Sequence, residues 1–447
     1  MKKRILIIIY LMGSFALAEA QNLRSIDQTT YQLYQQEQWE DLINYYKKNV
    51  KPEKVDYYYL RMRVGIAWYE RANYLKAIPH FRKALAFNSS SVTAKEYLYY
   101  SCLFSGQRHM ADKFVKRIPV DKRKTMNYES PAFFESIRFE MGVNASNGPN
   151  QASQFDLDGQ ASIYGEEAFT GNTIYTLIGM EHQLSSGFSI YHAYSGYRIS
   201  KDHRFISQGQ PRTFKYKVNQ SNYYLQPTLT LNNGLKLAGA YHHIHVSYDL
   251  PYRVAAQGNN YRKVPVEITD YLVHLSAGKY FGNMHFFLGG SYSELNDLQQ
   301  QKYKAEISWY PYGNYRFVPG ISLASFVQKA GDPGSANEGK ELIIKPFALW
   351  SLTDNFWLRG SYTFGELYNY NEEQGFIVYN IPDKITRKAE LTLNYRFNRQ
   401  LTLNINYRYM EREDEFLSYN STNQDDYSLT NYNFENHYII GGITWDF

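Results

Sequence analysis

An alternating pattern over the last residues of the chain constrains its fold most strongly. Counting back from Phe447 through Trp445 and Ile443, every second residue of the segment YIIGGITWDF is apolar or small, whereas Asp446 and Thr444 lie between them. Successive side chains of a β-strand point to opposite faces. The segment is therefore predicted to be a strand with one apolar face and one polar face. A soluble domain rarely ends on such a strand.

The same alternation recurs upstream as far as about Phe133. Leu401, Leu403 and Ile405 alternate with Thr402 and Asn404, and a similar run precedes them. Six short connections, rich in residues that tolerate tight turns, join such runs into predicted hairpins. With an opening and a closing strand, the six hairpins predict an antiparallel transmembrane β-barrel of about 14 strands over residues 133–447, with 12 or 16 as alternatives. The connections are Ser185-Ser186-Gly187, Asn232-Asn233-Gly234, Gly282-Asn283, Gly313-Asn314, Asp354-Asn355 and Asn398-Arg399-Gln400.

Longer polar stretches alternate with these turns. Short turns on one side of the membrane and long loops on the other are typical of outer-membrane barrels. We therefore expect the short turns to face the periplasm and the long stretches to face outside. The long stretches cover residues 201–216, 249–267, 329–340, 371–385 and 416–433.

Composition excludes a bundle of transmembrane helices. The mean hydropathy is −0.53, and no second apolar run is long enough for a membrane helix, yet 17% of the residues are aromatic. A β-barrel fits because its strands face lipid only at alternate residues and carry aromatic girdles. A soluble β-sandwich would show the same alternation and is the alternative fold. The small net charge of +5 does not indicate nucleic acid as a partner.

The N-terminus reads as a secretory signal peptide. Lys2, Lys3 and Arg4 precede an apolar run over residues 5–17, which is followed by Ala18-Glu19-Ala20. The run is shorter than the roughly 20 residues that span a bilayer, so cleavage after residue 20 is favoured over an uncleaved anchor. The only cysteine, Cys102, can form no intramolecular disulfide.

Residues 21–125 are predicted to form a separate helical domain, joined by a linker over residues 126–132 to the barrel domain. Apolar residues recur there at helical spacing, and small and aromatic residues recur 34 positions apart. The pattern resembles the tetratricopeptide repeat, whose small residues let paired helices approach closely; a plain helical bundle is the alternative. Such repeats imply a periplasmic surface for docking a partner protein. The residues predicted to pack between helices are Gly65, Trp68, Ala77, Phe81, Ala84, Gly106 and Ala111.

The closing strand also resembles that of bacterial outer-membrane barrels, in which the terminal residue is part of the signal read by the barrel-assembly machinery. This resemblance implies that Trp445 and Phe447 carry the signal. The whole layout is similar to that of the outer-membrane proteins that export cellulose or poly-N-acetylglucosamine, and of YaiO-type barrel proteins. It implies a Gram-negative outer membrane, with lipid around the barrel and the helices in the periplasm.

The barrel suggests a transport channel for a polar solute or a polysaccharide. Inward-facing polar side chains of several strands could line a wet lumen. A non-conducting anchor, whose helices recruit a partner for secretion or envelope assembly, is the alternative. No motif indicates catalysis, so we expect no enzymatic activity, and no cofactor or metal site is predicted; His243 and His245 share a strand face without further ligands. The predicted lumen-lining residues are Arg359, Glu390, Asn394, Arg396, Asn404, Asn406 and Arg408.

Overall fold

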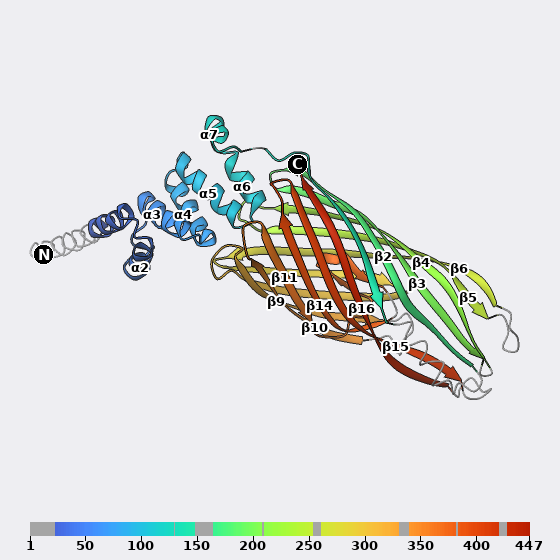
Figure 1. Ribbon diagram of the computed structural model, residues 1–447. Coiled ribbons are helices and arrows are strands. Elements are labelled where there is room, and N and C mark those ends of the chain that lie inside the picture. Colours follow the sequence, from blue (N-terminus) through green and yellow to red (C-terminus); the bar gives the residue numbers. More distant parts are fainter. Residues whose placement is uncertain are drawn as a thin grey trace, which may run out of the picture. The chain divides into compact units, whose positions relative to one another are not determined.

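A computed structural model describes residues 23–128, 130–147, 164–207, 210–253, 261–329, 339–380, 383–419 and 427–447. The predicted signal peptide lies outside these ranges. The chain divides into two compact units, one formed by the helices together with residues 310–315 and the other by the barrel (Figure 1).

The helical unit consists of consecutive helices that pack against one another. Residues 23–35 are helical, and the chain then forms further helices in order. Two of them begin at side chains that accept a backbone hydrogen bond, Asn73 from Lys76 and Ser91 from Ala94, which satisfies N–H groups that a helix start leaves free. No helix of the described residues is both long and apolar enough to cross a membrane. The helices are α2 (Trp39–Asn49), α3 (Tyr58–Glu70), α4 (Tyr74–Phe87), α5 (Val92–Phe104), α6 (Arg108–Val115) and α7 (Val120–Thr125).

Gly65 lies where α3 crosses α4. A Cβ atom at this position would be 2.7 Å from the ring of Phe81, so only glycine permits this approach. The Phe81 ring in turn stacks on Tyr97 of α5 at 5.2 Å, while Trp68 packs against the core cluster of the preceding helices. Gly106 has a positive φ in the turn between α5 and α6. The assignment of these helices to tetratricopeptide repeats remains a prediction. The other predicted packing residues, Ala77, Ala84 and Ala111, are buried.

Cys102 makes the folding of the helical unit measurable. The side chain is fully buried in α5, and burial raises the pKa of its thiol to about 12. Because the thiolate is the reactive species, we expect a maleimide at neutral pH to leave the folded protein unlabelled and to label it fully in denaturant. As the chain has a single cysteine, mass spectrometry reports this site alone. Rapid labelling of the folded protein would show that α5 is not packed as described.

The strands close into one antiparallel barrel of 14, which confirms the predicted fold class and strand number. Around the barrel the order is β1-β16-β15-β14-β11-β10-β9-β8-β7-β6-β5-β4-β3-β2, so only β12 and β13 leave the wall. The wall strands are β1 (Phe134–Ser146), β2 (Tyr164–Ser185), β3 (Phe188–Ser207), β4 (Gln210–Thr230), β5 (Lys236–Arg253), β6 (Tyr261–Phe281), β7 (Met284–Leu295), β8 (Leu298–Trp309), β9 (Phe317–Lys329), β10 (Gly339–Ser351), β11 (Phe356–Thr363), β14 (Lys384–Arg396), β15 (Leu401–Tyr419) and β16 (Tyr427–Asp446).

All six predicted short turns join consecutive strands at one end of the barrel, here called the short-turn end; the other is the long-loop end. The expected long loops are wrong in part, because strands continue into them. Residues 201–207 belong to β3 and residues 210–216 to β4, and β5, β6, β15 and β16 extend likewise. Residues 208–209, 254–260, 330–338 and 420–426 of these stretches lie outside the described residues. The stretch 371–385 does not face outside, as described below.

The wall is uneven in height. β2 contains 22 residues and β6 contains 21, whereas β7 and β8 contain 12 each. Since about 9–11 residues of a tilted strand cross a bilayer, the longer strands extend well beyond the apolar layer at the long-loop end. Water meets both faces of a strand there, so the alternation that marks the membrane segments fades. This explains why the sequence indicated loops.

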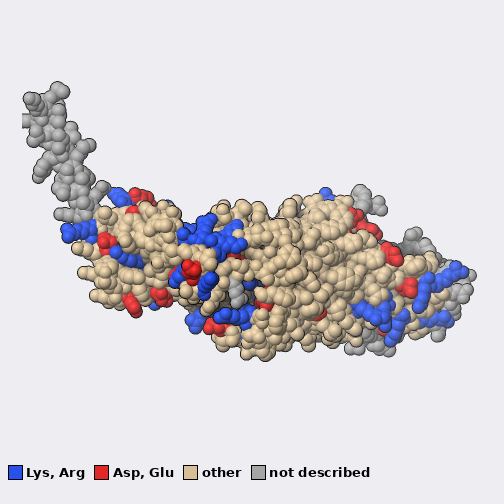
Figure 2. All heavy atoms as spheres, turned by 90° about the horizontal axis from the view of Figure 1, so that it is seen from above, with Lys and Arg blue, Asp and Glu red and all other residues tan. Residues whose placement is uncertain are grey.

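The outward face of the barrel is apolar. Leu275 of β6 and Leu288 of β7 expose 73% and 63% of their surface, and Met141, Leu342 and Ile443 on other strands are similarly exposed. Figure 2 shows a broad face of the barrel with few charged side chains, which lies between two groups of charged side chains, one of them toward the long-loop end. A continuous apolar surface of this kind is unusual on a soluble protein.

Candidate functional site

A hairpin between β11 and β14 leaves the wall and folds into the lumen. β11 ends at Thr363, and Gly365 then adopts a φ of +106°. A Cβ atom there would lie 2.8 Å from the carbonyl oxygen of Leu342 on the adjacent β10, so the chain turns inward at a position that requires glycine. Isolated bridges from Phe364 to Ile344 and from Leu367 to Ile385 anchor the two arms. We call residues 364–383 the plug; residues 381–382 are outside the described ranges.

The plug contains two very short strands, β12 (Tyr370–Glu372) and β13 (Ile377–Tyr379), joined by the turn η1 (Glu373–Gly375). Glu373, Gln374 and Gly375 have φ values of 45°, 62° and 84°. Left-handed conformations are unfavourable for residues other than glycine, so surrounding contacts must hold this turn. Three residues per strand are far too few to cross a bilayer.

Contacts on opposite walls show that the plug crosses the lumen. On one side, Tyr224 of β4 donates to the Gln374 carbonyl oxygen at 3.2 Å, and Nδ1 of His242 on β5 donates to the Gly375 carbonyl oxygen at 2.7 Å. Nε2 of Gln226 donates to Oε1 of Gln374 at 2.5 Å. On the other side, the plug contacts β10, β11 and β14 through ion pairs.

Polar contacts also hold the arms of the plug. Asn296, in the turn between β7 and β8, donates to Oδ1 of Asn369 at 2.6 Å and to the Asn380 carbonyl oxygen at 2.9 Å. The Lys302 ammonium of β8 is fully buried and donates to Oδ1 of Asn371 at 2.5 Å. At the end of the plug, Asp383 pairs with Arg412 of β15 at 3.2 Å.

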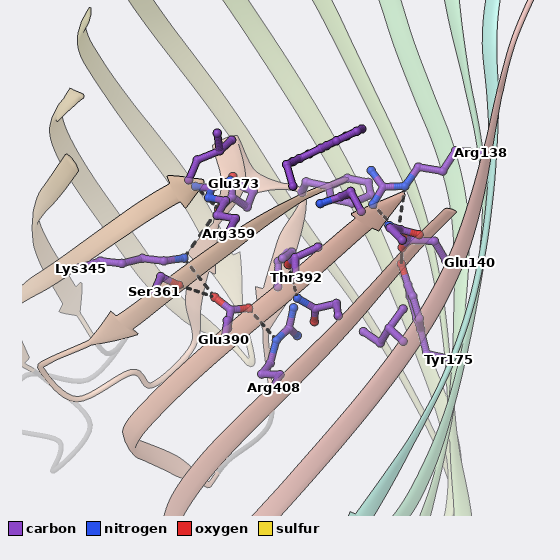
Figure 3. A pocket seen from close by; sticks show the side chains of 18 of the residues that line it. Arg138, Glu140, Tyr175, Lys345, Arg359, Ser361, Glu373, Glu390, Thr392 and Arg408 are labelled. Atoms are coloured by element: carbon purple, nitrogen blue, oxygen red, sulfur yellow. Dashed lines mark hydrogen bonds and ion pairs between the residues drawn. The ribbon is translucent and has the colours of Figure 1, made fainter. Parts of the chain in front are cut away.

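A buried ion network joins the plug to β10, β14 and β15. Glu390 lies at its centre: its carboxylate is 3.2 Å from the Lys345 ammonium, 2.8 Å from the Lys388 ammonium and 2.8 Å from Nε of Arg408. Glu372 of the plug pairs with both Lys345 and Lys388. Three cations therefore share two carboxylates, and only Glu372 belongs to the plug. Figure 3 shows Lys345 of β10 and Arg408 of β15 pointing toward Glu390 of β14 from opposite sides.

The Glu373 side chain, at the tip of the plug, is held more loosely than the neighbouring Glu372. The Glu373 carboxylate is 3.7 Å from the Lys345 ammonium and 3.8 Å from Nη2 of Arg359, beyond ordinary hydrogen-bond length. The Arg359 and Glu373 side chains are 41% and 42% exposed, whereas that of Lys388 is only 1% exposed. The Arg359 and Glu373 side chains are therefore accessible to a solute, and the network behind them is not.

Three cavities follow the plug along the lumen. The inner cavity, of about 440 Å³, lies toward the short-turn end, and the outer cavity, of about 210 Å³, lies toward the long-loop end. A narrow cavity of about 50 Å³ lies between them and shares lining residues with both. It is lined by Thr173, Tyr197, Ile199, Gln220, residues 377–380 of the plug, Arg408, Met410, Arg412 and Tyr438.

The inner cavity contains six of the seven predicted lumen-lining residues. Only Arg396 is not among its lining residues; its guanidinium lies over the Trp357 ring at 5.4 Å. Sequence reasoning missed Arg138, Glu140, Lys345 and the plug residue Glu373, because their strands show weaker alternation or were assigned to a loop. The predicted residues in the cavity are Arg359, Glu390, Asn394, Asn404, Asn406 and Arg408.

Other residues singled out from the sequence lie elsewhere. Trp445 of β16 pairs with Ile137 of β1 and with Leu401 of β15, and both Trp445 and Phe447 are exposed. Within the described residues no group of three or more histidine, cysteine or carboxylate side chains is arranged to hold a metal ion.

No protein-family model and no curated protein matches the chain. Among solved structures, the toluene transporter TodX of Pseudomonas putida is 9% identical with a TM-score of 0.43, over 70% of this chain and 90% of that one. A FadL homologue of Pseudomonas aeruginosa is 11% identical with a TM-score of 0.43 over the same shares, and a bacterial polysaccharide outer-membrane secretin is 12% identical with a TM-score of 0.36, over 71% and 99%. At these values the likeness extends to the barrel architecture and no further.

Proposed function

We propose that this chain is an outer-membrane channel for small polar solutes, closed by its plug, with the helical domain in the periplasm. The apolar outward face supports a lipid environment, because such a surface in water would favour aggregation. The short turns at one end and the longer strands at the other match the usual orientation of outer-membrane barrels.

The observation that carries the proposal is the row of cavities on the two sides of the plug. The inner and outer cavities are lined by charged and polar side chains from many strands. The narrow cavity of about 50 Å³ between them has room for only a few water molecules, each of which needs ~10–15 Å³ by the same measure. A small shift of the plug would join two wet compartments.

A small solute suits these dimensions better than a polysaccharide. A polymer in transit needs an unbroken bore through the barrel, whereas here the plug crosses the lumen. An inner cavity of about 440 Å³ lies within the ~300–1,000 Å³ of small-molecule sites.

The non-conducting anchor remains the second candidate, favoured by the many bonds that hold the plug to opposite walls. Conductance separates the two. In planar bilayers, the full chain purified in detergent is expected to show brief openings that become more frequent with voltage, because voltage acts on the charged plug. Liposomes containing it should swell in glucose faster than in a trisaccharide. A protein that stays closed at all voltages and admits no sugar would support the anchor.

A further inference from the structure

We propose that the inner cavity binds a small hydroxylated carboxylate, such as a sugar acid, whose carboxylate takes the place of Glu373 beside Arg359. The proposal deepens the channel function by naming the class of solute. It rests on the proposed channel function, because the ligand is a transported solute only if the barrel conducts. Binding itself can be measured without measuring transport.

Arg359 is the cation of the inner cavity with the weakest partner among the described residues. Its ion pair with Glu373 is 3.8 Å long, and its side chain is 41% exposed. The other cations that line the cavity have a carboxylate oxygen much closer: Lys345 at 3.2 Å and Arg408 at 2.8 Å. Arg138 likewise donates from Nε to Glu140 at 2.8 Å. A guanidinium presents donors in a planar fork that matches a carboxylate, so Arg359 has the capacity for an anionic ligand.

Charge in the cavity favours an anion. Four of its lining residues are cationic, namely Arg138, Lys345, Arg359 and Arg408, and three are anionic. When Glu373 moves away, four cations are left with two carboxylates, and an arriving carboxylate restores the original balance. A cationic ligand would instead be repelled, because the lining of the cavity already has a net positive charge.

Glu373 is suited to be displaced. Both of its ion pairs, at 3.7 and 3.8 Å, are longer than an ordinary hydrogen bond, so its carboxylate can move away while the bonds to Gln374 and Gly375 keep the turn in place. Lys345 keeps Glu372 and Glu390 when Glu373 moves away, because both remain 3.2 Å from its ammonium. Displacement therefore breaks two weak pairs, those of Glu373 with Lys345 and with Arg359, and the arriving carboxylate replaces the pair at Arg359.

Neutral polar groups surround this position and suit a ligand with hydroxyl groups. Ser361 lies two residues beyond Arg359 on the same inward face of β11, and Thr392 and Asn394 line the cavity from the neighbouring β14. Hydroxyl and amide groups can both donate to and accept from sugar hydroxyls. Figure 3 shows Arg359, Ser361 and Thr392 on one side of the cavity.

The test is isothermal titration of the full chain in detergent with D-galacturonate and, as the uncharged counterpart, D-galactose. We expect galacturonate to bind at least tenfold more tightly. Arg359→Gln should weaken galacturonate binding about tenfold or more, the effect of losing a charge-assisted hydrogen bond, with little change for galactose. Glu373→Gln should tighten galacturonate binding several-fold, because the internal competitor loses its charge.

Arg396→Gln is the matched control, since its guanidinium lies over Trp357 and does not line the cavity; its galacturonate affinity should stay within twofold of the parent. Equal binding of the two sugars, no binding of galacturonate even to Glu373→Gln, or equal losses in Arg359→Gln and Arg396→Gln would overturn the proposal. Galacturonate binding without any conductance would support this binding site and contradict the channel function. Conductance without galacturonate binding would support the channel function and contradict this binding site.

Discussion

Replacing residues 368–380 with a short Gly–Ser linker is expected to convert the closed barrel into a steadily conducting pore. Leu367 and Ile385 already pair across the base of the plug, so a short linker joins β11 to β14 without straining the wall. The deletion removes β12, η1 and β13, which separate the inner from the outer cavity. Single-channel recording in planar bilayers should show long-lived open levels where the parent shows brief ones.

The wall does not depend on the plug for its strand pairing. β11 and β14 pair directly through eight registered residue pairs from Phe356 to Thr363. The deletion variant should therefore keep the strand content of the parent by circular dichroism and resist unfolding in cold detergent gels. As a control, a Gly–Ser replacement of Asn232-Asn233-Gly234 alters a turn at the opposite end and should leave conductance as in the parent. If the plug-deleted, folded barrel stays closed, the anchor function is favoured over the channel.

The strands could be predicted where one face meets lipid and the other meets water. Leu401, Leu403 and Ile405 alternate with polar residues because these are the membrane positions of β15, and the turn at Asn398 is marked by its own residue types. The outer halves of β2 to β6 could not be recognised in this way. Both faces of these halves meet water or the plug. Apolar and polar residues therefore do not alternate there, and the sequence gives no sign of a strand.

The plug was misread as an outer loop because its contacts are distant in sequence. Asn371 meets Lys302 and Gln374 meets Tyr224, and no local pattern encodes such pairings. One signal was present: Tyr368 and Tyr370 alternate with Asn369 and Asn371 before Gly375, and a short apolar run from Phe376 to Tyr379 follows. Two strand-like runs too short to span a bilayer, placed around a glycine, indicate a hairpin that does not belong to the wall.

Glu372→Gln is expected to destabilise the barrel by about 3 kcal/mol, because it leaves buried charges without their partner. In the parent, Lys345, Lys388 and Arg408 share Glu372 and Glu390. The variant leaves three cations on one carboxylate, and the Lys388 side chain is only 1% exposed and cannot reach water. Urea unfolding in detergent micelles should show the loss. Openings in planar bilayers should become more frequent, since Glu372 ties the plug to the wall.

Removing one cation as well separates the charge effect from the loss of a side chain. In Glu372→Gln combined with Lys388→Met, two cations share one carboxylate, so the net charge of the network returns to its original value. Most of the lost stability should therefore be recovered, because a buried ion pair is often replaced by neutral side chains at little cost. The plug should nevertheless stay loose, because neither variant side chain can form the ion pair that ties it to β14.

A surface pair provides the contrast. Arg387 is 65% exposed and lies 3.1 Å from Glu411, so Glu411→Gln should change the free energy of unfolding by less than ~1 kcal/mol. If Glu372→Gln behaves like Glu411→Gln, the lumen around the plug is hydrated enough to solvate Lys388, and the ion network does not hold the channel closed. If stability and closure both fall in Glu372→Gln but only stability returns in the double variant, the ion pairs between Glu372 and the barrel wall hold the channel closed.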